Sequence, residues 1–225
     1  MSIKHPIISV TGSSGAGTST VKHTFQQIFR RESVKAATLE GDAFHRYNRK
    51  EMKKELEKRH AAGDATFSHF SFDANLLPEL EDCFRNYSEQ GTCRYRHYIH
   101  NSNEENLYGA KEGNFTKWEK FEEPSDLLFY EGLHGAVVNE EINLARYADL
   151  KIGVVPVINL EWIQKIHRDT DARGYSTEAV TDTILRRMHA YVHCICPQFT
   201  ETDINFQRVP VVDTSNPLVA RWIPT

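Results

Sequence analysis

The most informative stretch of this chain is IISVTGSSGAGTST, residues 7–20. A short apolar segment of strand length leads into a glycine-rich loop that reads GxxxxGx[ST], and an amphipathic helix follows, with Val21, Phe25, Ile28 and Phe29 predicted on its apolar face. The glycines let backbone N–H groups turn inward around an anion, and the helix presents its positive N-terminal end to the same point. The order of strand, loop and helix indicates a phosphate-binding loop, although a glycine-rich turn without a ligand has the same pattern.

Two positions of the loop bear on its chemistry. Ser19 stands where such loops carry the hydroxyl that ligates Mg²⁺. Thr18 stands where the usual lysine would be, so a positive charge on the phosphates has to come from elsewhere in the chain. The residues expected to bind the nucleotide phosphates are Gly12, Ser13, Ser14, Gly15, Ala16, Gly17, Thr18, Ser19 and Thr20.

The composition is that of an ordinary globular protein. The chain has 225 residues, 40% of them hydrophobic and 26% charged, which suits one domain over 1–225. A net charge of -4 argues against a nucleic-acid partner. No signal-peptide core or membrane-length apolar run occurs, so a cytoplasmic protein without a membrane partner is expected. The four cysteines are not expected to form a disulfide framework, and Cys194 and Cys196 lack the spacing of a zinc site.

Two acidic residues follow predicted strands. Asp42 comes just after the strand predicted over 35–40, and Glu131 lies near the end of the apolar strand 127–132, as the acid of a Walker B element does. Carboxyl ends of parallel strands meet at the edge of the sheet where α/β proteins bind ligands. Both acids are therefore candidates for the site, with a turn or a capped strand end as the structural alternative.

Basic residues near these acids are candidates for binding anions. His45 and Arg49 lie within about a turn of Asp42, whereas the rest of the basic run 46–59 is typical of a solvated helix face. The helix predicted over 159–173 ends in a cationic cluster, in which Lys165 and Arg168 are candidates to replace the missing loop lysine. The structural alternative is that these cations complement the helix dipole.

The fold expected is a P-loop α/β three-layer sandwich, in which helices cover both faces of a mostly parallel sheet with antiparallel additions at one edge. An insertion lobe is predicted around 63–125, with strands at 94–100 and 114–118 and a polar loop at 101–113. The other elements expected are helices over 76–84 and 177–194 and strands over 150–155 and 204–212.

The chain as a whole resembles the phosphoribulokinase family of bacterial type. The stretches that carry the resemblance are GSSGAGTST (12–20), EGDAFHR (40–46), FYEGLHG (129–135), VVPVINLEWIQKIHRD (154–169) and NFQRVPVVDTSNP (205–217). The resemblance implies ATP-dependent phosphorylation of the 1-hydroxyl of D-ribulose 5-phosphate, which gives ribulose 1,5-bisphosphate for the Calvin cycle, with ATP and Mg²⁺ as cofactors. Threonine at position 18 is also found in the bacterial family.

The resemblance also implies roles for individual residues. Asp42 matches the catalytic base, and Glu131 matches the Walker B acid beside Ser19. The remaining matches are His45, Arg49 and less distinctly His100 for the sugar phosphate, Arg168 and Arg173 for a mobile lid with Lys165 beside them, and Arg31 for the response to NADH and AMP. A homo-oligomer is expected.

The chain departs from the family's pattern in two respects. No cysteine precedes Cys83, so the thioredoxin control of the plant enzymes is not expected. The family's sequences continue past Thr225, so the C-terminal end is expected to be truncated.

Two alternative functions stay open. One alternative keeps the fold but changes the acceptor, as in uridine kinases. His45 and Arg49 favour a phosphorylated sugar over a nucleoside. The other alternative is a non-catalytic nucleotide-binding or assembly subunit.

Overall fold

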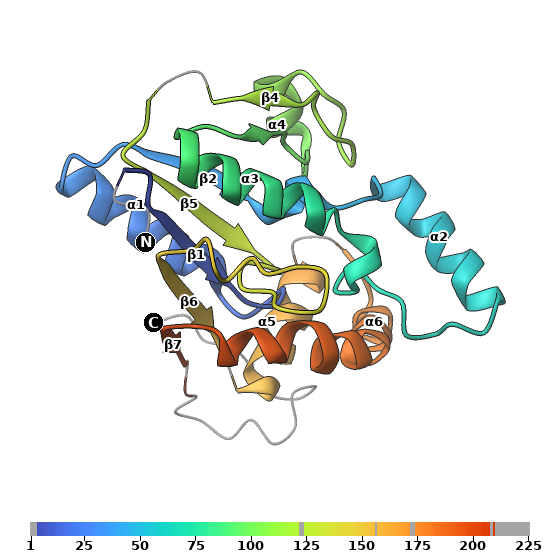
Figure 1. Cartoon of the computed structure of the whole chain (residues 1–225). Helices are drawn as coiled ribbons and strands as arrows, with labels where there is room; N and C mark the ends of the chain where they lie inside the picture. The colour runs from blue at the N-terminus through green and yellow to red at the C-terminus, as the bar shows by residue number, and fades with distance from the viewer. Residues whose placement is uncertain (1–3, 122–123, 156, 172–173, 208, 210–225) are drawn as a thin grey trace.

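The main sheet has five parallel strands in the order β2-β5-β1-β6-β7 (Figure 1). The computed structural model describes residues 4–121, 124–155, 157–171, 174–207 and 209. The strands of this sheet are β1 (Ile7–Thr11), β2 (Ala36–Glu40), β5 (Leu127–Gly132), β6 (Leu150–Val154) and β7 (Ile204–Phe206). Because β1 pairs with β5 on one side and with β6 on the other, the loop that follows it leaves from the middle of the sheet.

Six α-helices are described. They are α1 (Thr18–Arg31), α2 (Arg49–Ala61), α3 (Leu77–Gln90), α4 (Ser102–Tyr108), α5 (Ile158–Asp171) and α6 (Thr177–Ala190). Strand residues alternate between the two faces of the sheet: Leu128 and Tyr130 pack with α3 in one core cluster, and Phe129 between them packs with α1 in another. The predicted three-layer arrangement of a mostly parallel sheet between helices is confirmed.

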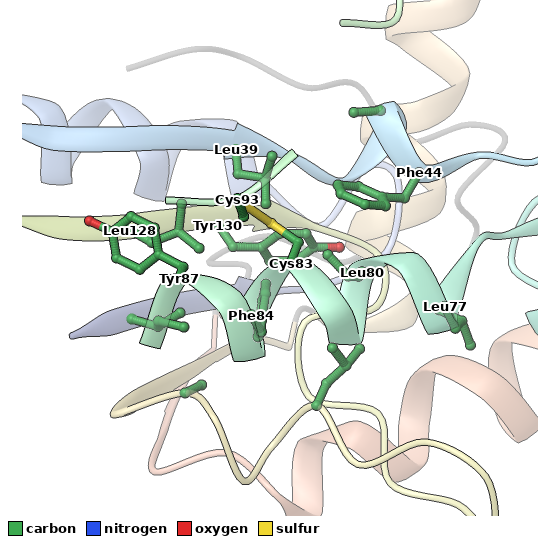
Figure 2. Close-up of a cluster of buried hydrophobic side chains, with 14 of the residues drawn as sticks. Leu39, Phe44, Leu77, Leu80, Cys83, Phe84, Tyr87, Cys93, Leu128 and Tyr130 are labelled. Carbon is green, nitrogen blue, oxygen red and sulfur yellow. A yellow bond between two sulfur atoms is a disulfide. The ribbon is translucent and has the colours of Figure 1, made fainter. Parts of the chain in front are cut away.

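The core under α3 holds most of the large buried side chains (Figure 2). Phe84 of α3 lies with its ring edge-on to that of Tyr130, 5.3 Å between ring centroids. In the same cluster Cys83 and Cys93 form a disulfide, which the sequence analysis did not predict. Helix α3 is followed by its C-cap Gly91 in the left-handed conformation, and this turn brings Cys93 back to within 4.9 Å of Cys83 between Cα atoms.

The opposite face of the sheet is covered by α1. Phe29 is buried there, and the partly buried Val21 and Phe25 pack against the same cluster, as predicted. Ile28, however, is 38% exposed, so its predicted place on the buried face is wrong. It precedes Phe29 by one residue, which is about 100° around a helix, and only one of these two neighbours can point straight at the sheet.

The region 94–120 forms a small unit beside the sheet. Strands β3 (Arg94–Tyr95) and β4 (Glu119–Lys120) pair antiparallel, and Tyr98 bridges to Phe115 farther along. Pairing between the two predicted segments is confirmed. In the described residues this antiparallel ribbon is separate from the main sheet rather than at its edge. The predicted polar loop 101–113 contains α4, which Asn101 caps by accepting from the N–H groups of Asn103 and Glu104.

Three further boundaries differ from those predicted. Helix α3 continues to Gln90, beyond the expected end at residue 84. Helix α6 ends at Ala190, where a π-helical turn over Tyr191–Ile195 begins, and β7 is described only as far as Phe206. No helix within the described part of the chain is both long enough and apolar enough to cross a membrane.

Candidate active site

The loop between β1 and α1 has a backbone that only glycine fits at several positions. Gly15 and Gly17 have φ angles of 109° and 101°, in the left-handed region that favours glycine. A Cβ on Gly12 would lie 3.0 Å from the carbonyl oxygen of Val154 and 2.9 Å from a side-chain carbon of Thr18. The glycine pattern of the sequence therefore has a steric cause in this fold.

Helix α1 begins directly after this loop. Its N-cap is Gly17, and among the described residues no side chain caps the helix N-terminus and no acidic residue lies in its first turn. The positive end of the helix and its first N–H groups are thus left for an anion rather than satisfied by the protein. This agrees with the phosphate-binding loop predicted from the sequence.

A cavity of about 720 Å³ opens in front of the loop at the carboxyl ends of the strands. Its described lining consists of Gly12, Ser13, Ser14, Gly15, Gly17, Thr18, Ser19, Lys22, Glu40, Gly41, Asp42, His100, Glu104, Glu131, Gly132, Leu133, Gln164, His167, Arg168 and Asp171. Two predicted loop residues are not in this lining: Ala16 is buried in the core under α1, and Thr20 is exposed. The cavity otherwise unites the loop with both predicted acids.

Asp42 reaches the cavity from the short 3₁₀ turn Gly41–Phe44 that follows β2. Its carboxylate lies between two imidazoles: Oδ1 is 3.1 Å from His45 Nε2, and Oδ2 is 3.4 Å from His100 Nε2. Burial by itself would raise the pKa of Asp42, but the charges of His45 and His100 outweigh burial and hold this pKa below its ordinary value. The group is therefore an ionised acceptor at neutral pH.

Glu131 lines the cavity at the end of β5, one strand from Asp42. Burial raises its pKa, a hydrogen bond from Thr18 partly offsets this, and the charge of Asp42 raises it further. A bound cation would relieve that repulsion. Carboxylate and hydroxyl oxygens are ligands that suit Mg²⁺, so Glu131 and Ser19 fit the metal implied by the family. The described residues contain no group of three or more His, Cys, Asp or Glu side chains arranged for a metal, and a nucleotide-bound Mg²⁺ commonly takes only one or two protein ligands.

Helix α5 places its two candidate cations, Arg168 and Lys165, in different cavities. Arg168 lines the large cavity, and its Nη2 donates to Ser14 Oγ over 3.2 Å. Lys165 is only 6% exposed; it donates to Asp169 Oδ2 over 2.7 Å and lines a second cavity of about 20 Å³ on the other side. Asp169 also accepts from Arg168 Nε, over 2.9 Å, so the two cations are joined through one carboxylate.

The other predicted residues lie farther from the cavity. His45 is partly buried and is absent from the described lining, but its Nε2 contacts Asp42 Oδ1. Arg49 is absent from the described lining; it pairs with Glu112 and donates to the carbonyl oxygen of His100 over 3.1 Å. Arg31 is an exposed residue at the end of α1, paired with Glu32. Arg173 lies outside the described residues.

Several lining residues were missed by the sequence analysis. Lys22 lies one helical turn after Thr18, and helical side chains extend toward the N-terminus, so Lys22 covers the turn where the usual lysine is missing. It pairs with Glu40. Burial lowers the pKa of Lys22, but the carboxylate of Glu40 outweighs this and raises it overall. The i, i+4 relation of residues 18 and 22 was a signal that could have found it.

The comparisons with known proteins agree with this geometry. Residues 7–215 match the family described as Phosphoribulokinase / Uridine kinase family. The chain is 74% identical to phosphoribulokinase 1 of Cereibacter sphaeroides, covering 100% of this chain and 78% of that protein. It is 67% identical to the phosphoribulokinase of Nitrobacter vulgaris, covering 99% and 77% of the two chains.

Solved structures show the same likeness. The phosphoribulokinase from Rhodobacter spheroides superposes with a TM-score of 0.87 at 72% identity, over 99% of this chain and 76% of that chain. D-glycerate 3-kinase from Cryptococcus neoformans superposes with a TM-score of 0.55 at 14% identity, over 87% and 80% of the chains, and shares the fold alone. A family match over most of the chain and this level of identity show that the chain belongs to the phosphoribulokinase/uridine kinase family.

Proposed function

We propose that this chain transfers the γ-phosphoryl group of ATP to the 1-hydroxyl of D-ribulose 5-phosphate, giving ADP and ribulose 1,5-bisphosphate. The observation that carries the proposal is the cavity of about 720 Å³ in which the glycine loop, Asp42, Glu131 and Arg168 meet. The 74% identity to a phosphoribulokinase supports the choice of acceptor within the family.

Each group has a role in this transfer. The backbone of the glycine loop holds the phosphates of ATP, with the N-terminus of α1 behind them. The hydroxyl oxygen bonds to the γ-phosphorus as the bond to the bridging oxygen breaks, and the hydroxyl proton passes to the carboxylate of Asp42. Arg168 and Lys22 line the cavity and supply positive charge near the phosphates in place of the lysine that Thr18 replaces.

Ser19 and Glu131 would hold Mg²⁺. When bound, the metal neutralises phosphate charge. Because Glu131 is partly buried and its charge repels that of Asp42, the substitution Glu131→Gln would lower the negative charge where the strands end. The NADH and AMP effectors, the role of Arg31 in their response and the oligomeric state remain predictions, which velocity measurements with each effector and sedimentation would test.

The acceptor is tested with purified protein, ATP and Mg²⁺, by following ADP release with ribulose 5-phosphate, ribose 5-phosphate and uridine in parallel. We expect release with ribulose 5-phosphate and formation of the bisphosphate. Preferential phosphorylation of uridine would instead favour the alternative of a nucleoside kinase.

The role of Asp42 is tested by Asp42→Asn, because an amide cannot accept the hydroxyl proton. General-base catalysis contributes about 10²-fold to 10⁴-fold, so kcat should fall by about 10²-fold or more with little change in nucleotide affinity. Glu57→Gln, on the exposed face of α2, serves as the matched control. Wild-type turnover in Asp42→Asn would contradict the assigned role.

A further inference from the structure

The imidazole of His45 is held between two different partners. Its Nε2 lies 3.1 Å from Asp42 Oδ1, and its Nδ1 lies 2.8 Å from Asn75 Oδ1. His45 is partly buried and Asn75 is only 3% exposed. The contact with Asn75 is thus made largely away from bulk water, where an unsatisfied or repulsive pair costs more than at the surface, whereas Asp42 lies at the cavity and its side chain is 38% exposed.

The backbone fixes this arrangement. His45 and Asn75 face each other in an antiparallel bridge. The flanking hydrogen bonds run from the N–H of Arg46 to the carbonyl oxygen of Ala74, 2.8 Å, and from the N–H of Leu76 to the carbonyl oxygen of Phe44, 2.7 Å. The facing residues are therefore a non-hydrogen-bonded pair, the kind in which opposite side chains approach most closely.

The side-chain amide of Asn75 has a defined orientation. Its nitrogen donates to the backbone carbonyl oxygens of His69, 2.9 Å, and Ser71, 2.8 Å. Carbonyl oxygens only accept, so the atom that faces them must be the NH₂ group. The atom that faces His45 is consequently the amide oxygen, which also only accepts. It follows that Nδ1 of His45 carries a proton.

The second ring nitrogen faces a carboxylate. With a proton already on Nδ1, a neutral His45 would turn the lone pair of Nε2 toward Asp42 Oδ1. Only the doubly protonated ring donates to both neighbours. We propose that Asn75 is a positioning residue that holds His45 as an imidazolium and thereby fixes the Asp42 carboxylate at the cavity. The kinetic part of this proposal rests on the proposed function, because it takes Asp42 as the acceptor of the hydroxyl proton.

The charges around His45 agree with the assignment. Burial lowers the pKa of His45, but the carboxylate of Asp42 and the hydrogen bond to Asn75 outweigh it, and the pKa is raised overall although Arg187 opposes it. The neighbouring His69 is neutral, because burial and Arg187 put its pKa well below the ordinary value. The ring of Tyr98 meets His45 edge-on at 6.3 Å, and Asp42 also faces His100.

The consequence for catalysis concerns orientation rather than base strength. One carboxylate oxygen of Asp42 is bound to a cation, which weakens it as a base but leaves it in a single orientation. Phosphoryl transfer depends mainly on positioning and charge, and the hydroxyl becomes acidic as its bond to phosphorus forms. A weak, fixed acceptor is therefore sufficient.

The first test uses the unmodified protein and needs no variant. In ¹⁵N-labelled protein at pH 7, long-range ¹H–¹⁵N spectra distinguish protonated from unprotonated ring nitrogens of His45. We expect both nitrogens to be protonated, and we expect both to remain so as the pH rises above the ordinary range of histidine. An unprotonated nitrogen at pH 7 would overturn the proposal, and this result is independent of which acceptor the enzyme uses.

The second test compares two variants of Asn75. Asn75→Leu removes the acceptor and the donors, whereas Asn75→Asp keeps an acceptor toward His45 and loses the donors to His69 and Ser71. We expect the pKa of His45 to fall by about one unit or more in Asn75→Leu and to stay raised in Asn75→Asp. Because the carboxylate of Asn75→Asp raises the pKa of His45 by its charge alone, the decisive variant is Asn75→Leu, and an unchanged pKa of His45 in Asn75→Leu would contradict the proposal.

Kinetics of the same variants test the effect on Asp42. In Asn75→Leu we expect kcat to fall tenfold or more while KM for ATP changes less than twofold. The control is Ser68→Ala, which removes a buried hydroxyl that accepts from the N–H of Phe70 in the same loop and leaves Asn75 intact. Ser68→Ala should change kcat less than twofold. An equal loss of kcat in Ser68→Ala would identify general loosening of the loop as the cause and reject the positioning role.

Discussion

At the scale of single residues, the candidate site depends on how charges are divided between α5 and the strand ends. Arg168 faces the cavity and contacts Ser14 of the phosphate loop, whereas Lys165 lies behind it against Asp169. Burial lowers the pKa of Lys165 to about 8, so part of its charge is lost just above neutral pH. Arg168 is therefore better placed than Lys165 to meet the phosphates directly.

The substitution Arg168→Met tests this division. Removal of a cation that meets the transferred phosphoryl group should lower kcat by about 10²-fold or more, since arginines in this role contribute about 10³-fold to 10⁵-fold. Arg186→Met is the control, because Arg186 pairs with Asp182 on the exposed side of α6. Steady-state kinetics with varied ATP separate kcat from KM. A change confined to KM would mean that Arg168 only binds nucleotide.

Lys165→Met tests the indirect role. The substitution removes one cation from the buried Asp169 and leaves its ion pair with Arg168 in place. We expect kcat to fall more than the affinity for ATP. Lys165 helps to hold the carboxylate of Asp169, which accepts from Arg168, so its loss disturbs the position of the Arg168 guanidinium without removing that group. Titration with ATP and kcat measured on the same sample check this. Normal turnover with weakened ATP affinity would contradict it.

At the scale of elements, α2 buries little of its surface against the rest of the chain. Met52 is its buried residue among those described, so packing contributes little to it. Asn48 caps it in a reciprocal capping box with Glu51. We expect Asn48→Ala to lower the free energy of unfolding by about 1 kcal/mol. Urea denaturation measures this, with the exposed Lys50→Ala as control; equal midpoints for both variants would show that the cap contributes nothing.

Helix α5 gives the chain a pH-dependent stability. Glu161 lies behind the phosphate loop and is 5% exposed, and burial raises its pKa from 4.5 to about 7. The folded state therefore holds the proton more tightly than the unfolded chain, and this group makes stability decrease as pH rises from about 4.5 to about 7. The decrease is on the order of 3 kcal/mol at most.

Glu161→Gln should remove that decrease, because a neutral amide does not titrate. Thermal unfolding at pH 5, 6 and 7 measures the slope of Tm against pH, which we expect to be flatter than in the wild type. Glu57→Gln, on the exposed surface of α2, should retain the wild-type slope. Unchanged slopes in Glu161→Gln would show that the carboxyl is already ionised in the folded protein.

At the scale of the whole molecule, ligands should couple the loop, the strand ends and α5, since all three line one cavity. We expect ADP with Mg²⁺ to raise Tm and ribulose 5-phosphate to raise it further. Each ligand adds its own increment to the free energy of unfolding, about 2.7 kcal/mol at one hundred times Kd. Differential scanning fluorimetry checks both increments. A response to nucleotide alone would favour the alternative of a non-catalytic nucleotide-binding subunit.

The features that depend on local steric and hydrophobic pattern could be predicted from the sequence. The glycines at 12, 15 and 17 are required by close approach or left-handed backbone, and the alternation of Leu128, Phe129 and Tyr130 divides the two faces of the sheet. The acids at 42 and 131 were found because carboxyl ends of parallel strands gather at one edge. These signals lie within one element and its neighbouring turn.

Which charged groups share the cavity depends on how the elements pack and could not be predicted from the sequence. Residues 165 and 168 have similar character in the sequence, but the packing of α5 against the loop puts one behind it and the other in front. The role of Asn75 was also hidden, since it is 30 residues from His45 and acts through a backbone bridge and an amide orientation. Such contacts join elements that are remote in sequence, and their geometry is set by the packing of the whole domain rather than by any local pattern.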